Sequence, residues 1–120
     1  MKLLIVESNP ELAKLWAGYL ERQGSDVVIA ISETEAVEIL RTCAVDVIVL
    51  DLVLDHGSAF AVADFASYRQ PDARVIFVTN TTFFSDGSLF RHIPNACAFL
   101  PTATSPEDLA AVIDHHRAAE

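Results

Sequence analysis

Five short apolar runs, separated by segments with helical periodicity, constrain the fold of this chain more than any other feature. The runs are rich in Val and Ile and apolar on successive residues: KLLIV (2–6), DVVIAI (26–31), DVIVL (46–50), RVIFVT (74–79) and CAFL (97–100). Strands of this kind are typical of a parallel sheet that helices cover on both faces. The pattern therefore predicts an α/β fold.

The segments around these runs carry the start and stop signals of helices. Clear helical patterns span residues 10–24, 32–42, 57–70 and 105–119. Pro10 suits a first helical turn, and Gly24 suits the end of that helix. Ser32 and Ser105 can cap the second and the last helix, and Pro106 then takes the first position of the last one. In the first helix the apolar residues recur every three or four positions, as one buried face requires: Leu12, Leu15, Trp16, Tyr19 and Leu20.

Five strand–helix units follow from this order. Residues 83–95 give the weakest pattern, one or two helical turns interrupted by Gly87 and Pro94. Right-handed crossovers place helices on both faces of the sheet, and the common arrangement of five such units is the flavodoxin-like, doubly wound (βα)5 fold with strand order 2-1-3-4-5. We expect residues 1–120 to form a single domain, without an output domain.

Composition excludes several classes of function. The net charge of −9 argues against nucleic-acid binding, since no basic patch is present to meet phosphates. No stretch reaches the roughly 20 apolar residues that span a membrane, and the first residues do not resemble a signal peptide. The two cysteines, Cys43 and Cys97, form no CxxC pair and are interpreted as reduced core residues of a cytoplasmic protein.

Polar residues follow the predicted strands at the sheet edge where such folds hold their sites. Glu7 and Ser8 follow the first strand, Asp51 follows the third, Thr79 ends the fourth and Thr102 follows the fifth. Strands 1 and 3 are neighbours in the predicted order, so Glu7 and Asp51 are expected to face each other. Two carboxylates in one pocket repel unless a cation or a proton intervenes, and Mg²⁺ prefers oxygen ligands.

These stretches resemble a response-regulator receiver domain over the whole length of the chain. The similar segments are LLIVESN, VDVIVLDLVLDHGSAF, VIFVTN and ACAFLPTATSPEDL. The resemblance implies that Asp51 accepts a phosphoryl group from a histidine kinase or a phosphotransfer protein. It also implies that the Thr79 hydroxyl contacts the phosphoryl group, that Phe99 is the aromatic switch residue, and that the backbone carbonyl of Val53 binds the metal.

Two signature positions of the resemblance are replaced. Glu7 and Ser8 occupy the usual pair of acids, of which the second is the direct metal ligand, and here that ligand is a serine. Thr102 occupies the position of the usual lysine, and Ala103 that of the proline after it. A serine oxygen is a poorer Mg²⁺ ligand than a carboxylate, so we expect Mg²⁺ binding to be weak or absent. We accordingly expect an atypical receiver whose Asp51 accepts phosphoryl groups weakly.

Some of these residues also have simpler interpretations. Ser8 can cap the first helix instead of approaching a metal, and this role is slightly favoured. Glu7 can be a solvated carboxylate, and Phe99 is first a core or half-exposed aromatic residue and only second a moving switch. Phe83 and Phe84 can either pack inward or be exposed for a partner.

Two functions remain after this comparison, and neither is enzymatic. The first is a receiver of a two-component phosphorelay, and the alternative is a pseudo-receiver that binds proteins without phosphorylation. Both would dock a downstream protein, or a second copy in a homodimer, through residues 83–95, the fifth strand and the last helix. A flavin- or nucleotide-binding enzyme is disfavoured because ESNPEL, after the first strand, holds no glycine to cradle a phosphate.

Overall fold

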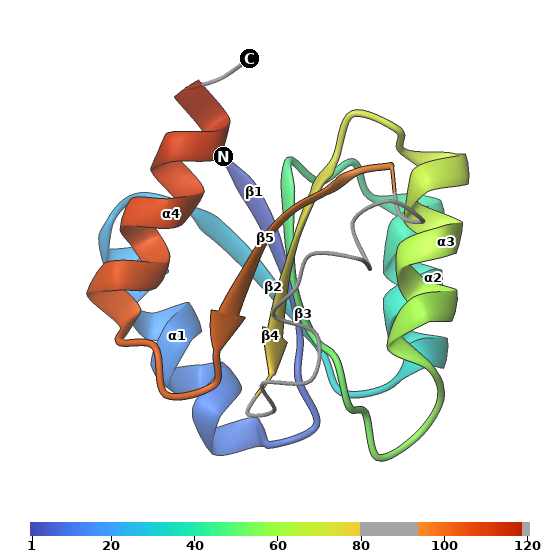
Figure 1. Cartoon of the computed structure of the whole chain (residues 1–120), viewed down its shortest axis with the longest axis horizontal. Helices are drawn as coiled ribbons and strands as arrows, with labels where there is room; N and C mark the ends of the chain where they lie inside the picture. The colour runs from blue at the N-terminus through green and yellow to red at the C-terminus, as the bar shows by residue number, and fades with distance from the viewer. Residues whose placement is uncertain (80–93, 119–120) are drawn as a thin grey trace.

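The computed structural model describes residues 1–79 and 94–118, which form a five-stranded parallel sheet in the order β2-β1-β3-β4-β5 (Figure 1). The strands are β1 (Lys2–Val6), β2 (Asp26–Ala30), β3 (Val47–Asp51), β4 (Arg74–Thr79) and β5 (Ala96–Pro101). The helices are α1 (Pro10–Arg22), α2 (Glu33–Thr42), α3 (Ala59–Arg69) and α4 (Pro106–Ala118). The predicted flavodoxin-like fold and strand order are confirmed.

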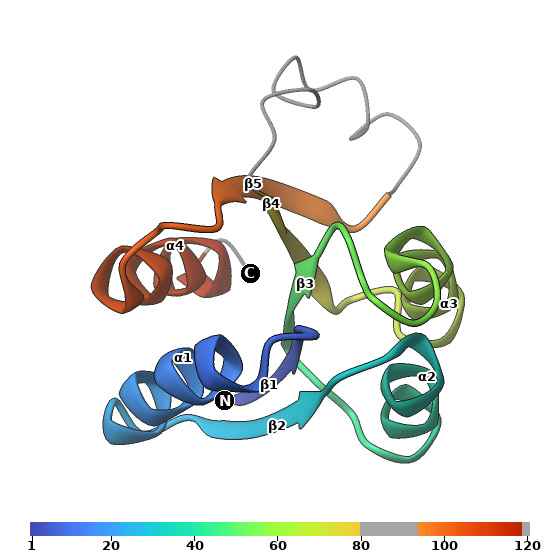
Figure 2. The same cartoon turned by 90° about the horizontal axis from the view of Figure 1, so that it is seen from below.

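The helices of the described residues cover both faces of the sheet (Figures 1 and 2). α1 and α4 lie on one face, and α2 and α3 lie on the other. Successive strand residues alternate between these two layers, as in β1, where Leu3 and Ile5 pack with the α1–α4 layer while Leu4 and Val6 pack with the α2–α3 layer. This explains why the strands are apolar on consecutive residues.

The first helix begins one residue later than a Ser8 cap requires. The side-chain oxygen of Asn9 accepts hydrogen bonds from the backbone N–H groups of Glu11 and Leu12, at 3.0 and 3.4 Å. Pro10 therefore occupies the first helical position, as predicted, and the preceding residue is the cap. The prediction that Ser8 caps this helix is wrong.

The other predicted helix ends agree with the structure. Gly24 lies just after α1 with a φ of 95°, a left-handed conformation that glycine adopts without strain. Ser32 accepts a hydrogen bond from the Glu35 N–H at 3.2 Å, and Ser105 accepts one from the Asp108 N–H at 3.1 Å. Both serines thus satisfy backbone donors that a helix leaves unpaired.

The predicted apolar face of α1 is correct in part, and two of its residues, Leu12 and Tyr19, are half-buried. Trp16 and Leu20 are buried, whereas Leu15 is exposed on the outer side of the helix. The additional buried positions are small residues, Ala13 and Ala17, which let the helix approach the sheet closely.

The expected helical turns at residues 83–95 fall almost wholly outside the described part of the chain, as do Phe83 and Phe84. Within the described part, no helix is long and apolar enough to span a membrane.

Candidate functional site

The carboxyl ends of β1 and β3 lie side by side at one edge of the sheet (Figure 2). The two strands pair in parallel from Leu3 with Val47 to Val6 with Leu50. Glu7 and Asp51 each follow one member of the last pair. The sheet register therefore brings the two carboxylates to adjacent strand ends.

Glu7 is almost fully buried, with 3% of its surface exposed. Its carboxylate accepts a hydrogen bond from the backbone N–H of Asn9 at 3.2 Å. Burial, followed by a hydrogen bond with Asp51 and the charge of Asp51, raises the pKa of Glu7 to about 7. The Asn9 bond acts in the opposite direction but is outweighed. Near neutral pH the Glu7 carboxyl is thus partly protonated, which relieves its repulsion with the Asp51 carboxylate.

Asp51 is half-buried and is held by the loop that follows it. One of its carboxylate oxygens accepts a hydrogen bond from the backbone N–H of Val53 at 3.1 Å. The Leu52 N–H continues the sheet ladder by donating to the carbonyl of Val78 at 2.8 Å. The Asp51 side chain thus has a defined position at the sheet edge.

Ser8 contacts the loop between β3 and α3. Its hydroxyl oxygen accepts a hydrogen bond from the backbone N–H of Asp55 at 2.9 Å. On its other side the same loop contacts Glu33, whose N–H donates to the carbonyl of His56 at 3.1 Å and whose carboxylate accepts from the Ser58 N–H at 2.8 Å. The sequence reasoning missed Glu33 and Asp55, because no local pattern links them to the strand ends.

Thr79 and Thr102 come together at the ends of β4 and β5. The Thr102 N–H donates to the carbonyl of Thr79 at 3.0 Å, and Thr79 is 8% exposed. In the pairing of β3 with β4, Asp51 lies opposite Val78, so Thr79 is one residue beyond that position. Thr102 supplies a hydroxyl but no positive charge.

Phe99 packs against a neighbouring aromatic residue of the core. It is half-buried and stacks on the fully buried Phe77, with ring centroids 5.2 Å apart and an angle of 19° between the ring planes. The Phe77 ring also lies beside the Phe60 ring, with 6.4 Å between the ring centroids. Phe99 therefore packs against the core layer of α2 and α3.

The cysteines and the histidines of α4 lie apart from the sheet edge that holds Asp51, and His56 contributes only its backbone carbonyl there. Cys43 and Cys97 are free and half-buried, and burial raises the pKa of the Cys97 thiol to about 11. The rings of His115 and His116 pack edge to face on α4, with 5.1 Å between their centroids. His56 is exposed, and its side chain is not part of the contact that its carbonyl makes. The described side chains include no group of three His, Cys, Asp or Glu residues suited to a metal ion.

The carboxylates that a divalent cation could bind at this edge are those of Glu7 and Asp51. Mg²⁺ is commonly held by one or two carboxylates and several waters, so this set fits the ion with fewer charged ligands than three acids would give. The hydroxyl oxygen of Ser8 already accepts a backbone hydrogen bond. Because the Glu7 carboxyl is partly protonated near neutral pH, a cation that binds it would have to displace that proton.

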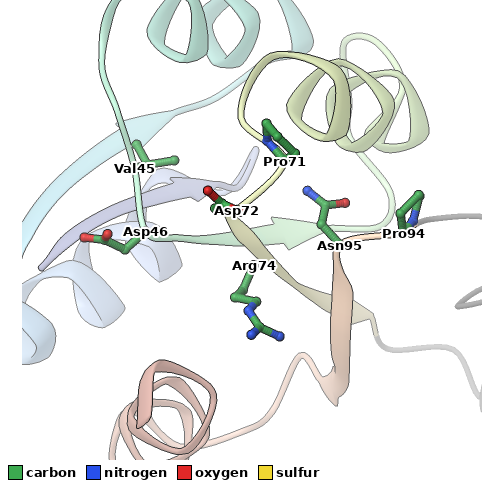
Figure 3. Close-up of a pocket in the computed structure, with 7 residues that line it drawn as sticks. All are labelled: Val45, Asp46, Pro71, Asp72, Arg74, Pro94 and Asn95. Carbon is green, nitrogen blue, oxygen red and sulfur yellow. The ribbon is translucent and has the colours of Figure 1, made fainter. Parts of the chain in front are cut away.

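A separate pocket of about 440 Å³ lies at the opposite edge of the sheet (Figure 3). Its lining residues come from the connections that enter β3, β4 and β5 and from the first residue of β4: Val45, Asp46, Pro71, Asp72, Arg74, Pro94 and Asn95. The amide nitrogen of Asn95 donates to the carbonyl of Ala73 at 3.0 Å, whereas its side-chain oxygen has no partner and no accessible surface. Since that oxygen cannot be reached even by water, the pocket offers no buried acceptor to a ligand, and it lies far along the strands from Asp51.

Comparison with known proteins gives a consistent result. A family model described as the response regulator receiver domain matches residues 3–90. No curated protein sequence matches significantly. The family match includes Glu7, Ser8, Asp51 and Thr79 but ends before β5, so the positions of Phe99 and Thr102 depend on structural similarity.

Solved structures match nearly the whole chain. The non-phosphorylated HemR receiver domain from Leptospira biflexa is 23% identical, with a TM-score of 0.85 over 96% of this chain and 92% of that one. A CheY-like receiver domain protein from Methanospirillum hungatei is 19% identical, with a TM-score of 0.86 over 99% and 98% of the two chains. A Burkholderia pseudomallei response regulator with a phosphorylated aspartic acid, a calcium ion and citrate is 24% identical, with a TM-score of 0.83 over 93% and 65%.

Proposed function

Because the chain belongs to the response regulator receiver domain family, we propose that it is a two-component receiver that accepts a phosphoryl group weakly at Asp51 and signals by docking proteins. The observation that carries this proposal is the half-buried Asp51 carboxylate at the end of β3, hydrogen-bonded by the Val53 N–H and adjacent to Glu7. Domains of this family are in general signalling domains and not enzymes.

The proposed transfer takes place at a carboxylate oxygen of Asp51. That oxygen supplies the electron pair of the new P–O bond, while the P–N bond of a phosphohistidine donor breaks and its electron pair stays on the donor imidazole. The attacking carboxylate has to be ionised, and the raised pKa of the neighbouring Glu7 favours a proton on Glu7. The hydroxyl of Thr79 is proposed to contact the transferred group, and Phe99 to respond to it as the aromatic switch residue.

The proposed Mg²⁺ ligands are the carboxylates of Asp51 and Glu7 and the carbonyl of Val53. When bound, the ion would supply positive charge for the phosphoryl oxygens. Ser8 is assigned a weaker role there, because its hydroxyl oxygen already accepts the Asp55 N–H. The expected affinity is low.

The missing ammonium group at Thr102 is the main reason to expect slow transfer. Phosphoryl transfer depends mostly on positioning and charge neutralisation. Losing one charge-assisted contact commonly costs about 2–4 kcal/mol of transition-state stabilisation, which corresponds to a slowing of roughly 10²–10³-fold. The Thr102 N–H still donates to the Thr79 carbonyl, so the backbone position of residue 102 is fixed although its side chain is uncharged.

The proposed partners are those of a receiver in the cytoplasm. A histidine kinase or a phosphotransfer protein would supply the phosphoryl group, and a downstream protein would dock at the face of β5 and α4. Homodimerisation through the same face is part of this proposal. The predicted contribution of residues 83–95 to that face lies mostly outside the described residues.

A second function is favoured by the state of the carboxylates. Glu7 is partly protonated near neutral pH, and Ser8 and Thr102 replace two charged groups of the family pattern. A pseudo-receiver that binds its partner without phosphorylation would need none of these charges. The two functions share a fold and differ only in whether partner binding depends on modification of Asp51.

Incubation with a small phosphodonor, read by intact mass, separates the two functions. The protein is incubated with acetyl phosphate, with Mg²⁺ or with EDTA, beside the Asp51→Asn variant. A slow adduct that is absent in the variant supports the phosphorelay receiver. No adduct over hours contradicts it and supports the pseudo-receiver.

A further inference from the structure

The loop between β3 and α3, residues 52–58, is fastened from two sides. On the α2 side, Glu33 contacts the loop twice, through the carbonyl of His56 and the N–H of Ser58. On the β1 side, the described contact is the hydrogen bond from the Asp55 N–H to the Ser8 hydroxyl oxygen, at 2.9 Å. The loop thus spans the space between the ends of α2 and β1.

The Ser8–Asp55 hydrogen bond connects two segments that are 47 residues apart in the sequence. Ser8 belongs to the turn between β1 and α1, directly after Glu7, and it is half-buried. Asp55 is exposed and lies two residues after Val53, whose N–H donates to Asp51. A change in this one bond therefore acts on the short loop segment that surrounds the proposed acceptor.

We propose that Ser8 is a positioning residue that holds the β3–α3 loop against the β1–α1 turn in the absence of any metal ion. Through its hydrogen bond the hydroxyl orders the loop, and we expect this order in EDTA as well as in Mg²⁺. Ser8 need not touch the phosphoryl group or the partner to have this effect. The inference concerns the unphosphorylated domain and can fail without affecting the proposed function.

Amide hydrogen exchange, measured by NMR on the whole chain without a phosphodonor, tests this role. The amide of Asp55 is followed in the wild type, Ser8→Ala and Ser8→Thr, each in EDTA and in Mg²⁺. One hydrogen bond of ordinary strength corresponds to about a fivefold change in the opening equilibrium. We therefore expect Asp55 exchange to be about fivefold faster in Ser8→Ala and close to wild type in Ser8→Thr, which retains the hydroxyl.

Two controls separate a local effect from general destabilisation. Exchange at Val49, in the middle of β3, is expected to stay unchanged in Ser8→Ala, since global unfolding would accelerate it as well. The matched variant Ser25→Ala removes a half-buried serine hydroxyl near the opposite edge of the sheet and is expected to leave Asp55 unchanged.

The same data contain the results that would overturn the proposal. Equal Asp55 exchange in the wild type and Ser8→Ala would show that the hydroxyl does not hold the loop. Protection of Asp55 in the wild type only after addition of Mg²⁺ would show that the ion, and not Ser8, orders it. Equal acceleration at Asp55 and Val49 would assign Ser8 a general structural role instead.

Discussion

Replacing Glu7 with Gln should change how the stability of the domain depends on pH. Glu7 is 3% exposed, and its pKa in the folded protein is raised from 4.5 to about 7, first by burial and then by Asp51. Gln has nearly the same shape as the protonated acid and cannot lose a proton. The variant therefore imitates the low-pH state of Glu7 at every pH.

The sign and size of the effect follow from proton linkage. Between pH 4.5 and 7 the folded state holds more protons than the unfolded state, so wild-type stability falls as the pH rises. The stabilising contribution is complete below pH 4.5 and is lost once the pH has passed about 7. A difference of this size in pKa corresponds to about 3 kcal/mol in the free energy of unfolding. We expect Glu7→Gln to match the wild type near pH 4.5 and to be more stable by up to about 3 kcal/mol at pH 8.

Urea unfolding at constant ionic strength, in EDTA and at several pH values between 4.5 and 8, measures this difference directly. Glu21→Gln is the matched control, because it makes the same chemical change at an exposed position of α1 and should give no comparable step. Asp51→Asn should reduce the step, since it removes the negative charge beside Glu7 and leaves burial as the remaining cause. A stability difference between wild type and Glu7→Gln that is constant across this range would refute the raised pKa of the buried Glu7.

Three further substitutions test the local structure by urea unfolding. Gly57→Ala should destabilise the domain by about 1–3 kcal/mol, because Gly57 has a φ of +99° and an added Cβ would collide with the Glu33 side chain; an unchanged midpoint would contradict this loop conformation. Gln70→Ala should cost about 1–3 kcal/mol, since its side chain hydrogen-bonds three backbone groups between α2 and β3 at 2.6–2.8 Å, whereas a loss within error would argue against these bonds. Asn9→Ala should lower the free energy of unfolding by about 1 kcal/mol, because it removes the α1 cap. If Ser8→Ala showed this loss and Asn9→Ala did not, Ser8 would be the cap instead.

The fold was predictable because its signals are local. Each apolar run is a strand in the structure, and the caps at Ser32 and Ser105 follow from the side chains that precede each helix. The start of α1 could also have been predicted correctly. Since Pro10 is favoured at the first helical position, Asn9 and not Ser8 is the residue placed to cap it.

The contacts that fix the site depend on residues far apart in the sequence. The partner of Ser8 is 47 residues away, and Glu33 reaches Ser58 across 25 residues. No periodicity or cap motif encodes such pairs, since they form only after α2, α3 and β1 have packed around the sheet. The direction of the Glu7 pKa shift, in contrast, follows from two carboxylates at adjacent strand ends, where a proton or a cation must relieve the repulsion.

The two replaced signature positions have different consequences for the site. At Ser8 the lost carboxylate is compensated by a hydrogen bond that holds the β3–α3 loop, so geometry is retained while a metal ligand is lost. At Thr102 the backbone contact with Thr79 is retained, and the threonine side chain carries no positive charge. The local backbone contacts are therefore retained at both residues, while the charged side chains of the family pattern are lost. Because docking to a partner requires the positions and phosphoryl transfer requires the charges, we expect substitutions at this edge to impair phosphorylation of Asp51 more than partner binding.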